Sequence, residues 1–190
     1  MSKDVYGSIA QLSALEREGF DYRVRRRIVP GSSTAIVAPH GGRIERRTSR
    51  IARAIAGKDF NLYLFEGTKS SGNRTLHITS HRFDELRCLS MVSKAERVIA
   101  IHGCRGRDHI VYLGGLDKAT KSALASGLRA GGFRVKTTFH KFLATHPQNI
   151  CNRGAKGNGV QIELSLGLRL TGNIDSLAFT IGRVLRERKV

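Results

Sequence analysis

One segment constrains the fold of this chain more than any other: an apolar run that ends at a histidine followed by two glycines. Residues 34–38 are apolar and rich in β-branched side chains, which is typical of a strand buried on both faces. The segment 39–42, Pro-His-Gly-Gly, ends the run. Residues 45–56 then place apolar side chains at helical spacing, and Gly57 supplies a stop. A buried strand, a glycine turn and a helix in this order favour an α/β fold around a mostly parallel or mixed sheet.

The same alternation of strands and helices continues along the rest of the chain. Further helices are predicted over residues 8–18, 83–92, 117–130 and 174–188. Further strands are predicted over residues 22–29, 62–65, 98–101, 110–113, 133–136 and 160–164. Residues 139–159 contain many turn residues and form a candidate functional loop. Because no repeat or long linker divides the chain, we expect a single domain over residues 1–190, with a mixed sheet flanked by helices.

The composition is that of a folded protein without a membrane segment. Hydrophobic residues make up 40% of the chain and charged residues 25%, close to the averages of globular proteins. No apolar run approaches the roughly 20 residues of a membrane helix, and residues 1–11 lack the pattern of a secretion signal. Three cysteines without a close pair suggest neither a disulfide framework nor a cysteine-rich zinc module. We therefore expect a cytoplasmic protein.

A large positive charge indicates an anionic partner. The chain has 33 Lys and Arg against 15 Asp and Glu, which gives a formal net charge of +18. Nucleic acid is the most frequent polyanionic partner of basic proteins, but an acidic polypeptide would be attracted by the same field. Aromatic residues are only 6% of the chain and tryptophan is absent, so a base-stacking surface is poorly supplied. Charge alone does not choose between these partners.

Two histidines directly follow predicted strands. His40 comes after residues 34–38, and His102 comes after residues 98–101. Ligands of open α/β sheets gather at the carboxyl ends of strands. Glu45 is predicted to open the helix after His40, and the intervening glycines allow its carboxylate to approach the imidazole. Two imidazoles and one carboxylate are a ligand set of catalytic zinc sites, so we predict a single zinc here, with ordinary polar loop residues as the alternative.

A third acidic residue is a candidate for the base that such hydrolysis requires. In the strand 160–164, Val160, Ile162 and Leu164 share one face, which leaves Glu163 on the opposite, polar face. A carboxylate that does not bind the metal could take the proton from water and pass it to the leaving group. From the spacing alone, an ion pair between Glu163 and Arg169 is an equally good interpretation.

Six groups of residues, in order along the chain, together resemble the poly-γ-glutamate hydrolase family. They are residues 38–45 (APHGGRIE), 62–67 (LYLFEG), 76–80 (LHITS) with 83–85 (FDE), 100–103 (AIHG), 113–117 (LGGLD), and 152–154 (NRG) with 159–165 (GVQIELS). This resemblance implies a fold similar to that of zinc carboxypeptidases, with one zinc. It also implies cleavage of the γ-amide bonds of poly-γ-glutamate, a bacterial capsule polymer.

The resemblance assigns roles to individual residues. The metal ligands of the family correspond to His40, Glu45 and His102, and its catalytic carboxylate corresponds to Glu163. Asn152 and Arg153 resemble the pair with which zinc carboxypeptidases hold a substrate carboxylate, and Arg82 adds positive charge nearby. A loop turn with a solvent-facing arginine is the alternative for the Asn-Arg pair.

The resulting hypothesis is a monomeric zinc hydrolase with a polyanionic substrate and no membrane partner. Because family members come from phages and bacteria, a phage-encoded enzyme released on lysis of the host fits the resemblance. The rival hypothesis is a basic nucleic-acid-binding protein, associated with phage replication, that has no hydrolase activity. DNA binding would not require His40, Glu45 and His102 to converge, so the positions of these three side chains separate the two hypotheses.

Overall fold

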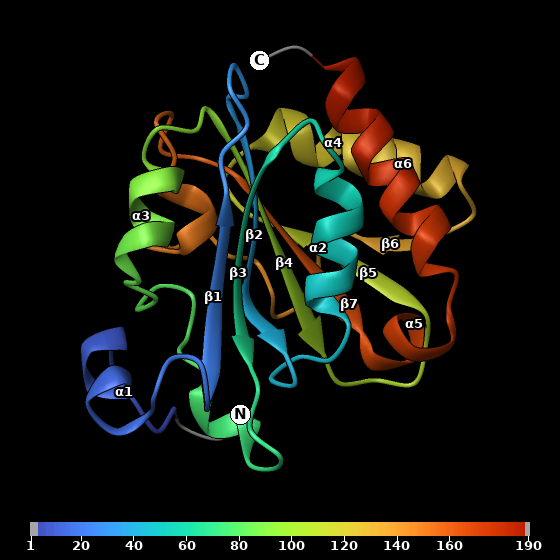
Figure 1. The fold of residues 1–190 in the computed structure, drawn as a ribbon. Helices are drawn as coiled ribbons and strands as arrows, with labels where there is room; N and C mark the ends of the chain where they lie inside the picture. Colours follow the sequence, from blue (N-terminus) through green and yellow to red (C-terminus); the bar gives the residue numbers. More distant parts are fainter. Residues whose placement is uncertain (1–3, 189–190) are drawn as a thin grey trace.

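One mixed sheet of seven strands runs through residues 4–188, the part of the chain that the computed structural model describes (Figure 1). The strands are β1 (Tyr22–Arg27), β2 (Thr34–Gly42), β3 (Asn61–Gly67), β4 (Arg97–Cys104), β5 (Ile110–Gly114), β6 (Arg134–Lys136) and β7 (Val160–Ser165). Their order across the sheet is β1-β3-β2-β4-β7-β5-β6. Strands β3, β2, β4 and β7 are parallel, whereas β1 and β5 pair antiparallel with β3 and β7. Residues 1–3 and 189–190 of the predicted domain lie outside the described range.

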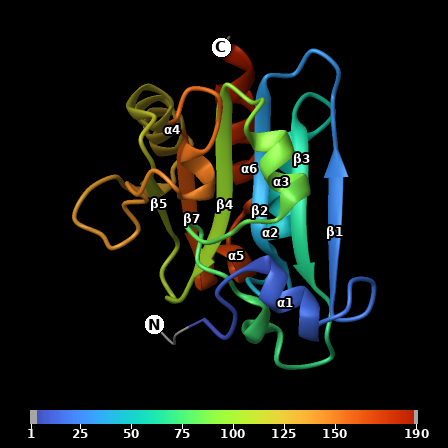
Figure 2. The same cartoon turned by 90° about the vertical axis from the view of Figure 1, so that its left-hand side faces the viewer.

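Helices cover both faces of the sheet, which confirms the predicted α/β architecture. They are α1 (Ile9–Leu15), α2 (Thr48–Ala56), α3 (Leu86–Val92), α4 (Lys118–Ala130), α5 (Leu166–Thr171) and α6 (Ile174–Glu187), with two 3-10 turns, η1 (Asn73–Leu76) and η2 (Ile150–Asn152). Helices α2, α4 and α6 pack on one face, and α3 and η2 lie on the other (Figure 1 and Figure 2). Within residues 4–188, none of these helices is long and apolar enough to cross a membrane.

The strands alternate their side chains between two apolar cores. Ile36 and Ile99 face α2 and α6, while Val37 and Tyr63 face α3 on the other side. All four are fully buried. Burial of one aliphatic side chain of this kind stabilises the fold by roughly 1.5–3 kcal/mol. Because both faces of the central strands are covered, these strands are continuously apolar, as the sequence indicates.

The chain reverses its direction of travel across the sheet at β2. From β2 it passes through α2 to β3 on one side, and it then returns through α3 to β4 on the other side. Such a switch point leaves a crevice at the carboxyl ends of the two strands that flank it. The pairing of β2 with β4 ends at Val37 and Ala100, so the backbones are free to separate beyond these residues. The crevice therefore lies where the sequence predicts the functional histidines.

Five strands are longer than predicted, β2, β3, β4, β5 and β7, and two of these differences concern the site. β2 continues to Gly42 and β4 continues to Cys104, so His40 and His102 belong to the strands instead of following them. β4 is extended because it also pairs in parallel with β7 as far as Ser165. This difference keeps both histidines on rigid backbone.

Two predicted helices, α2 and α3, begin three residues later than expected. The prediction that Glu45 opens α2 is wrong, because the helix begins at Thr48. Arg47 has a left-handed φ of 72°, which interrupts the helix, and the Glu45 carbonyl accepts hydrogen bonds from Thr48 N and Thr48 Oγ1. Glu45 consequently sits in the turn between β2 and α2. The short helix α5 is also absent from the sequence-based prediction.

We expect Gly41→Ala to destabilise the protein by about 1–3 kcal/mol, because the added methyl group would have no room. A Cβ atom at Gly41 would collide with Ser49 Oγ and would lie 2.9 Å from the Phe65 carbonyl oxygen. Denaturant unfolding measures the loss. Gly7→Ala is the control, since its Cβ would meet only the far ends of two flexible side chains, Gln11 at 3.1 Å and Arg82 at 3.9 Å. Equal stability of both variants would contradict the close approach at Gly41.

Candidate metal centre

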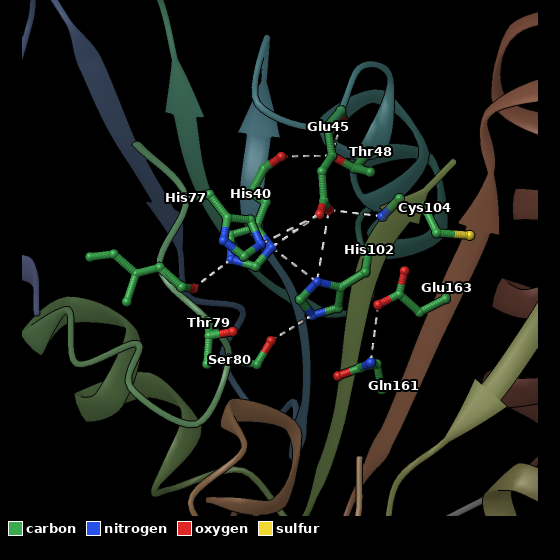
Figure 3. A network of polar contacts seen from close by, with 12 residues as sticks. His40, Glu45, Thr48, His77, Thr79, Ser80, His102, Cys104, Gln161 and Glu163 are labelled. Atoms are coloured by element: carbon green, nitrogen blue, oxygen red, sulfur yellow. Dashed lines mark hydrogen bonds and ion pairs between the residues drawn. The ribbon is translucent and has the colours of Figure 1, made fainter. Parts of the chain in front are cut away.

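Four polar side chains meet near the carboxyl ends of β2 and β4 (Figure 3). His40 comes from β2, His102 from β4, Glu45 from the turn before α2, and His77 from the segment after η1. The exposed fractions of His40, Glu45 and His102 are 1%, 8% and 2%. The group is therefore shielded from bulk water. In such a shielded place, charges and metal ions interact strongly with protein ligands.

A main-chain contact fixes the proton of His40. Its Nε2 lies 2.7 Å from the carbonyl oxygen of Ile78, which can only accept a hydrogen bond. Nε2 therefore donates, and in the neutral ring the lone pair is on Nδ1. Thr48 Oγ1 donates to the His40 carbonyl oxygen at 3.3 Å and helps to hold the strand end. A hydrogen bond from the other ring nitrogen to a main-chain carbonyl, like that of His40 Nε2 to Ile78, is typical of metal-ligating histidines.

The Nδ1 atoms of the two strand histidines face each other. They lie 3.1 Å apart, and His40 Nδ1 lies 3.4 Å from Glu45 Oε1. Burial and the neighbouring His40 lower the pKa of His102 to about 3, so His102 is neutral at neutral pH. Its Nε2 is 3.4 Å from Ser80 Oγ, a hydroxyl that can accept or donate, so His102 Nδ1 carries the lone pair in the tautomer whose Nε2 donates to Ser80. Two nitrogen lone pairs at this distance repel each other unless a proton or a cation lies between them.

Glu45 brings a negative charge to the same place. Burial alone would raise the pKa of Glu45, but the charge of His40 and its hydrogen bond hold that pKa at about 2. The Gly103 N–H donates to Glu45 Oε2 at 2.8 Å, which orients the carboxylate toward the histidines. His102 Nδ1 lies 3.8 Å from the same oxygen. Glu45 is therefore an anion beside the neutral imidazole of His102.

This donor set fits a single zinc ion. Zinc binds histidine nitrogen and carboxylate oxygen at about 2.0–2.1 Å, which places tetrahedral ligands roughly 3.3 Å apart. The separations of 3.1 Å and 3.4 Å around His40 Nδ1 match that spacing, while the 3.8 Å between His102 and Glu45 is slightly long. Neutral imidazoles and an ionised carboxylate are also the protonation states that a metal requires.

The sequence analysis missed His77. Its ring stacks on His40 with centroids 4.0 Å apart, and its Nε2 lies 3.9 Å from Glu45 Oε1. His77 Nδ1 donates to Asp4 Oδ1 at 2.7 Å, so the lone pair on Nε2 points toward Glu45. The ligand atoms of His40, Glu45 and His77 all lie within 4.8 Å of one another. The motif at residues 76–80 contains His77, but Asp4 is too distant in sequence for the pair to be predicted.

His102 is also within reach of a metal ion shared with His40. Its Nδ1 lies 3.1 Å from His40 Nδ1. His77 Nε2 is 3.9 Å from Glu45, and Asp4 holds the opposite side of the ring through Nδ1. Burial and the charge of His40 lower the pKa of His77 to about 4, so this ring is also neutral at neutral pH.

Glu163 lies beside His102 on the next strand (Figure 3). The predicted alternation of β7 is confirmed, because Gln161 and Glu163 share one face and Gln161 Nε2 donates to Glu163 Oε1 at 3.1 Å. Burial and the negative charge of Glu45 raise the pKa of Glu163 well above its ordinary value. Within residues 4–188, no ion pair joins Glu163 to Arg169, whose guanidinium binds main-chain carbonyls instead.

The predicted substrate-binding residues have other partners than this group. The buried Asn152 side chain donates to the carbonyl oxygens of Ala144 and His146 and holds the loop before η2. Arg153 is half-buried and donates to the Phe83 carbonyl oxygen at 3.4 Å, and Arg82 is exposed. In the described part of the chain, no hydrogen bond or ion pair joins these residues to the metal-binding group. Their substrate role stays a prediction.

The sequence of this chain is similar to those of known proteins over most of its length. The model of a family described as poly-gamma-glutamate hydrolase matches residues 6–177. The protein UPF0714 YndL of Bacillus subtilis (strain 168) is 39% identical over 170 residues, which covers 88% of this chain and 66% of YndL. This chain therefore spans about two thirds of the length of that relative.

Two solved structures superpose on nearly the whole chain. A bacteriophage poly-gamma-glutamate hydrolase has a TM-score of 0.93 and 30% sequence identity, with coverage of 97% of this chain and 98% of that chain. A zinc-free form of YndL has a TM-score of 0.91 and 34% identity, with coverage of 99% and 100%. These matches confirm the fold that the sequence predicts.

We expect Glu163→Gln to stabilise the metal-free protein at alkaline pH. Because the folded-state pKa of Glu163 is raised, its contribution to folding is fully present only below its ordinary pKa and is lost as pH rises. Glutamine removes this loss and can still accept the hydrogen bond from Gln161. The measurement is the melting temperature with chelator at pH 5 and pH 8, where each kcal/mol corresponds to about 2–4 °C.

The matched control is Glu187→Gln, an exposed carboxylate on α6 that pairs with Arg183. It should change the two melting temperatures little. A Glu163→Gln protein that loses as much stability between pH 5 and pH 8 as the parent would contradict the raised pKa of Glu163.

Proposed function

Because this chain belongs to the poly-γ-glutamate hydrolase family, we propose that it is a zinc-dependent hydrolase of γ-glutamyl amide bonds. Its substrate is poly-γ-glutamate or a similar acidic polymer. The observation that carries the proposal is the approach of two buried imidazole Nδ1 atoms to 3.1 Å beside the Glu45 carboxylate. A cation is the simplest way to satisfy both lone pairs and the negative charge together.

In this proposal, His40 Nδ1, His102 Nδ1 and Glu45 hold one zinc and leave a position open for water. The existence of a zinc-free form of YndL, described as such, supports the choice of metal. His77 stays outside the coordination sphere in this proposal, stacked on His40 and held by Asp4. When bound, zinc would polarise the scissile carbonyl and lower the pKa of its water from 15.7 toward about 7.

Glu163 is the proton carrier of the proposed reaction. It takes a proton from the attacking water as the oxygen bonds to the amide carbon, and it delivers that proton to the departing amine as the carbon–nitrogen bond breaks. The products are a carboxylate and an amine. The raised pKa of Glu163 suits this role, because a carboxyl group must hold the proton between the two steps.

The charge of the molecule supports an acidic polymer as substrate. A net charge of +18 attracts polyanions over long distances and concentrates them near the surface. Arg153 and Arg82 lie on segments near the site, and we propose that their guanidinium groups bind free carboxylates of the polymer. In this proposal the protein is a soluble enzyme that is made in the cytoplasm and reaches the polymer when the host cell lyses.

The proposed metal site can be tested directly. We expect about one zinc per chain in protein purified without chelator, measured by elemental analysis, because the three ligands are buried and preorganised. His102→Ala should lose most of it. The control is His109→Ala, which removes an exposed histidine bound to Thr171. Stoichiometric zinc in the double variant His40→Ala/His102→Ala would show that the metal binds elsewhere.

The proposed reaction can also be tested. Poly-γ-glutamate incubated with zinc-loaded protein should shorten to oligomers in size-exclusion chromatography, and a chelator should stop the shortening. Glu163→Gln should keep its zinc but turn over about two to four decades more slowly, because the proton carrier is gone. Rising salt should slow cleavage of dilute polymer, because it screens the attraction.

The nucleic-acid hypothesis gives a different outcome of the same assay. Polymer that stays intact with every metal tried, together with tight and sequence-independent binding of duplex DNA, would replace the hydrolase proposal with a binding function.

A further inference from the structure

Arg169 in α5 is a buried charge that lacks an acidic partner in hydrogen-bond contact within residues 4–188. Its exposed fraction is 3%. Its guanidinium instead donates to three main-chain carbonyl oxygens, those of Leu164 through Nε at 3.1 Å, Cys104 through Nη2 at 3.1 Å, and Arg46 through Nη1. Burial of an arginine is unfavourable unless its donors are satisfied. The three carbonyl oxygens provide these hydrogen bonds, but they do not neutralise the charge.

The three carbonyls belong to the three segments that carry the proposed site. Arg46 directly follows Glu45, and Leu164 directly follows Glu163. Cys104 is two residues after His102, at the end of β4. One planar group therefore joins the turn before α2, the end of β4 and the end of β7. Their relative positions set where Glu45, His102 and Glu163 stand.

Gly103 makes this arrangement possible. A Cβ atom at Gly103 would lie 2.5 Å from Arg169 Cζ and 2.6 Å from Arg169 Nε, so the guanidinium packs directly against the glycine backbone. The N–H of the same glycine donates to Glu45 Oε2 at 2.8 Å. Gly103 thus contacts the arginine and holds the Glu45 carboxylate through its backbone.

We propose that Arg169 is a positioning residue, which fixes the distances between Glu45, His102 and Glu163 without touching substrate or metal. The inference rests on the proposed zinc site. It explains why arginine occupies this position, because its fork of planar donors reaches three carbonyls at once and the compact ammonium of lysine does not. It also explains the glycine that follows His102.

The chain contains a matched control for this role. Arg97, at the start of β4, is 5% exposed and donates to the carbonyl oxygens of Leu185 and Arg188. Both arginines are buried, both bind main-chain carbonyls, and both lie on or beside the same strand. Arg97 lies at the opposite end of β4 from His102, so it shares the structural task but not the position beside the site.

The experiment compares Arg169→Met with Arg97→Met in the full chain. Both variants should lower the melting temperature, because each leaves buried carbonyls without donors. Only Arg169→Met should bind zinc about 10–100-fold more weakly in a chelator competition titration, the usual effect of losing an outer partner of metal ligands. Only Arg169→Met should change the visible spectrum of bound Co²⁺, which reports the ligand geometry. Gly103→Ala should reproduce both effects with every hydrogen-bond donor retained.

An Arg169→Met protein with the zinc affinity and Co²⁺ spectrum of the parent, and with the same loss of melting temperature as Arg97→Met, would overturn the proposal. If Arg169→Met does not fold, Gly103→Ala and Arg169→Lys carry the same comparison. Parent-like zinc affinity in both of them would be equally decisive against it.

A second measurement separates this inference from the proposed function. In zinc-free protein, the imidazole nitrogen resonances of His40 and His102 should shift in Arg169→Met and stay unchanged in Arg97→Met. Failure of the parent to bind zinc would defeat the proposed function, while these resonances would still decide whether Arg169 sets the site geometry. Unchanged resonances in Arg169→Met would overturn the positioning role.

Discussion

The separation of β2 from β4 beyond Val37 and Ala100 is the constraint on which the site depends. Because the pairing of the two strands ends there, backbone groups beyond this point lose their partners in the sheet. Buried polar groups must then find other hydrogen-bond partners. His40 uses the Ile78 carbonyl, and Glu45 uses the Gly103 N–H. The end of the β2–β4 pairing and the contacts that orient His40 and Glu45 therefore occur at the same place in the sheet.

The same buried environment gives two carboxylates opposite properties. Glu45 is surrounded by imidazoles, and the charge of His40 holds its pKa at about 2 despite burial. Glu163 faces burial and the negative charge of Glu45 on the neighbouring strand, and its pKa rises. Each effect reinforces the other, because a more firmly ionised Glu45 makes ionisation of Glu163 less favourable. Environments that push two titratable groups apart in this way divide the roles of ligand and proton carrier.

Sequence patterns predicted the parts of this arrangement that are local. The apolar run before His40, the alternation that isolates Glu163 and the strand before His102 all follow from periodicities of a few residues. The missed parts depend on contacts across the chain. His77 becomes part of the site only through Asp4, 73 residues away, and the late start of α2 follows from one left-handed residue. Nothing in the local pattern reveals either contact.

The excess of positive charge has a structural origin as well as a functional consequence. Several arginines bind main-chain carbonyls where ion pairs would otherwise be expected: Arg27, Arg43, Arg47, Arg97 and Arg169. A neutral carbonyl satisfies the donors of a guanidinium but cancels none of its charge. The fold can therefore use arginine as a cross-link between segments without adding an acidic residue for each one. The unbalanced charge that results creates a field that extends into solvent and attracts polyanions, the class of substrate that we propose.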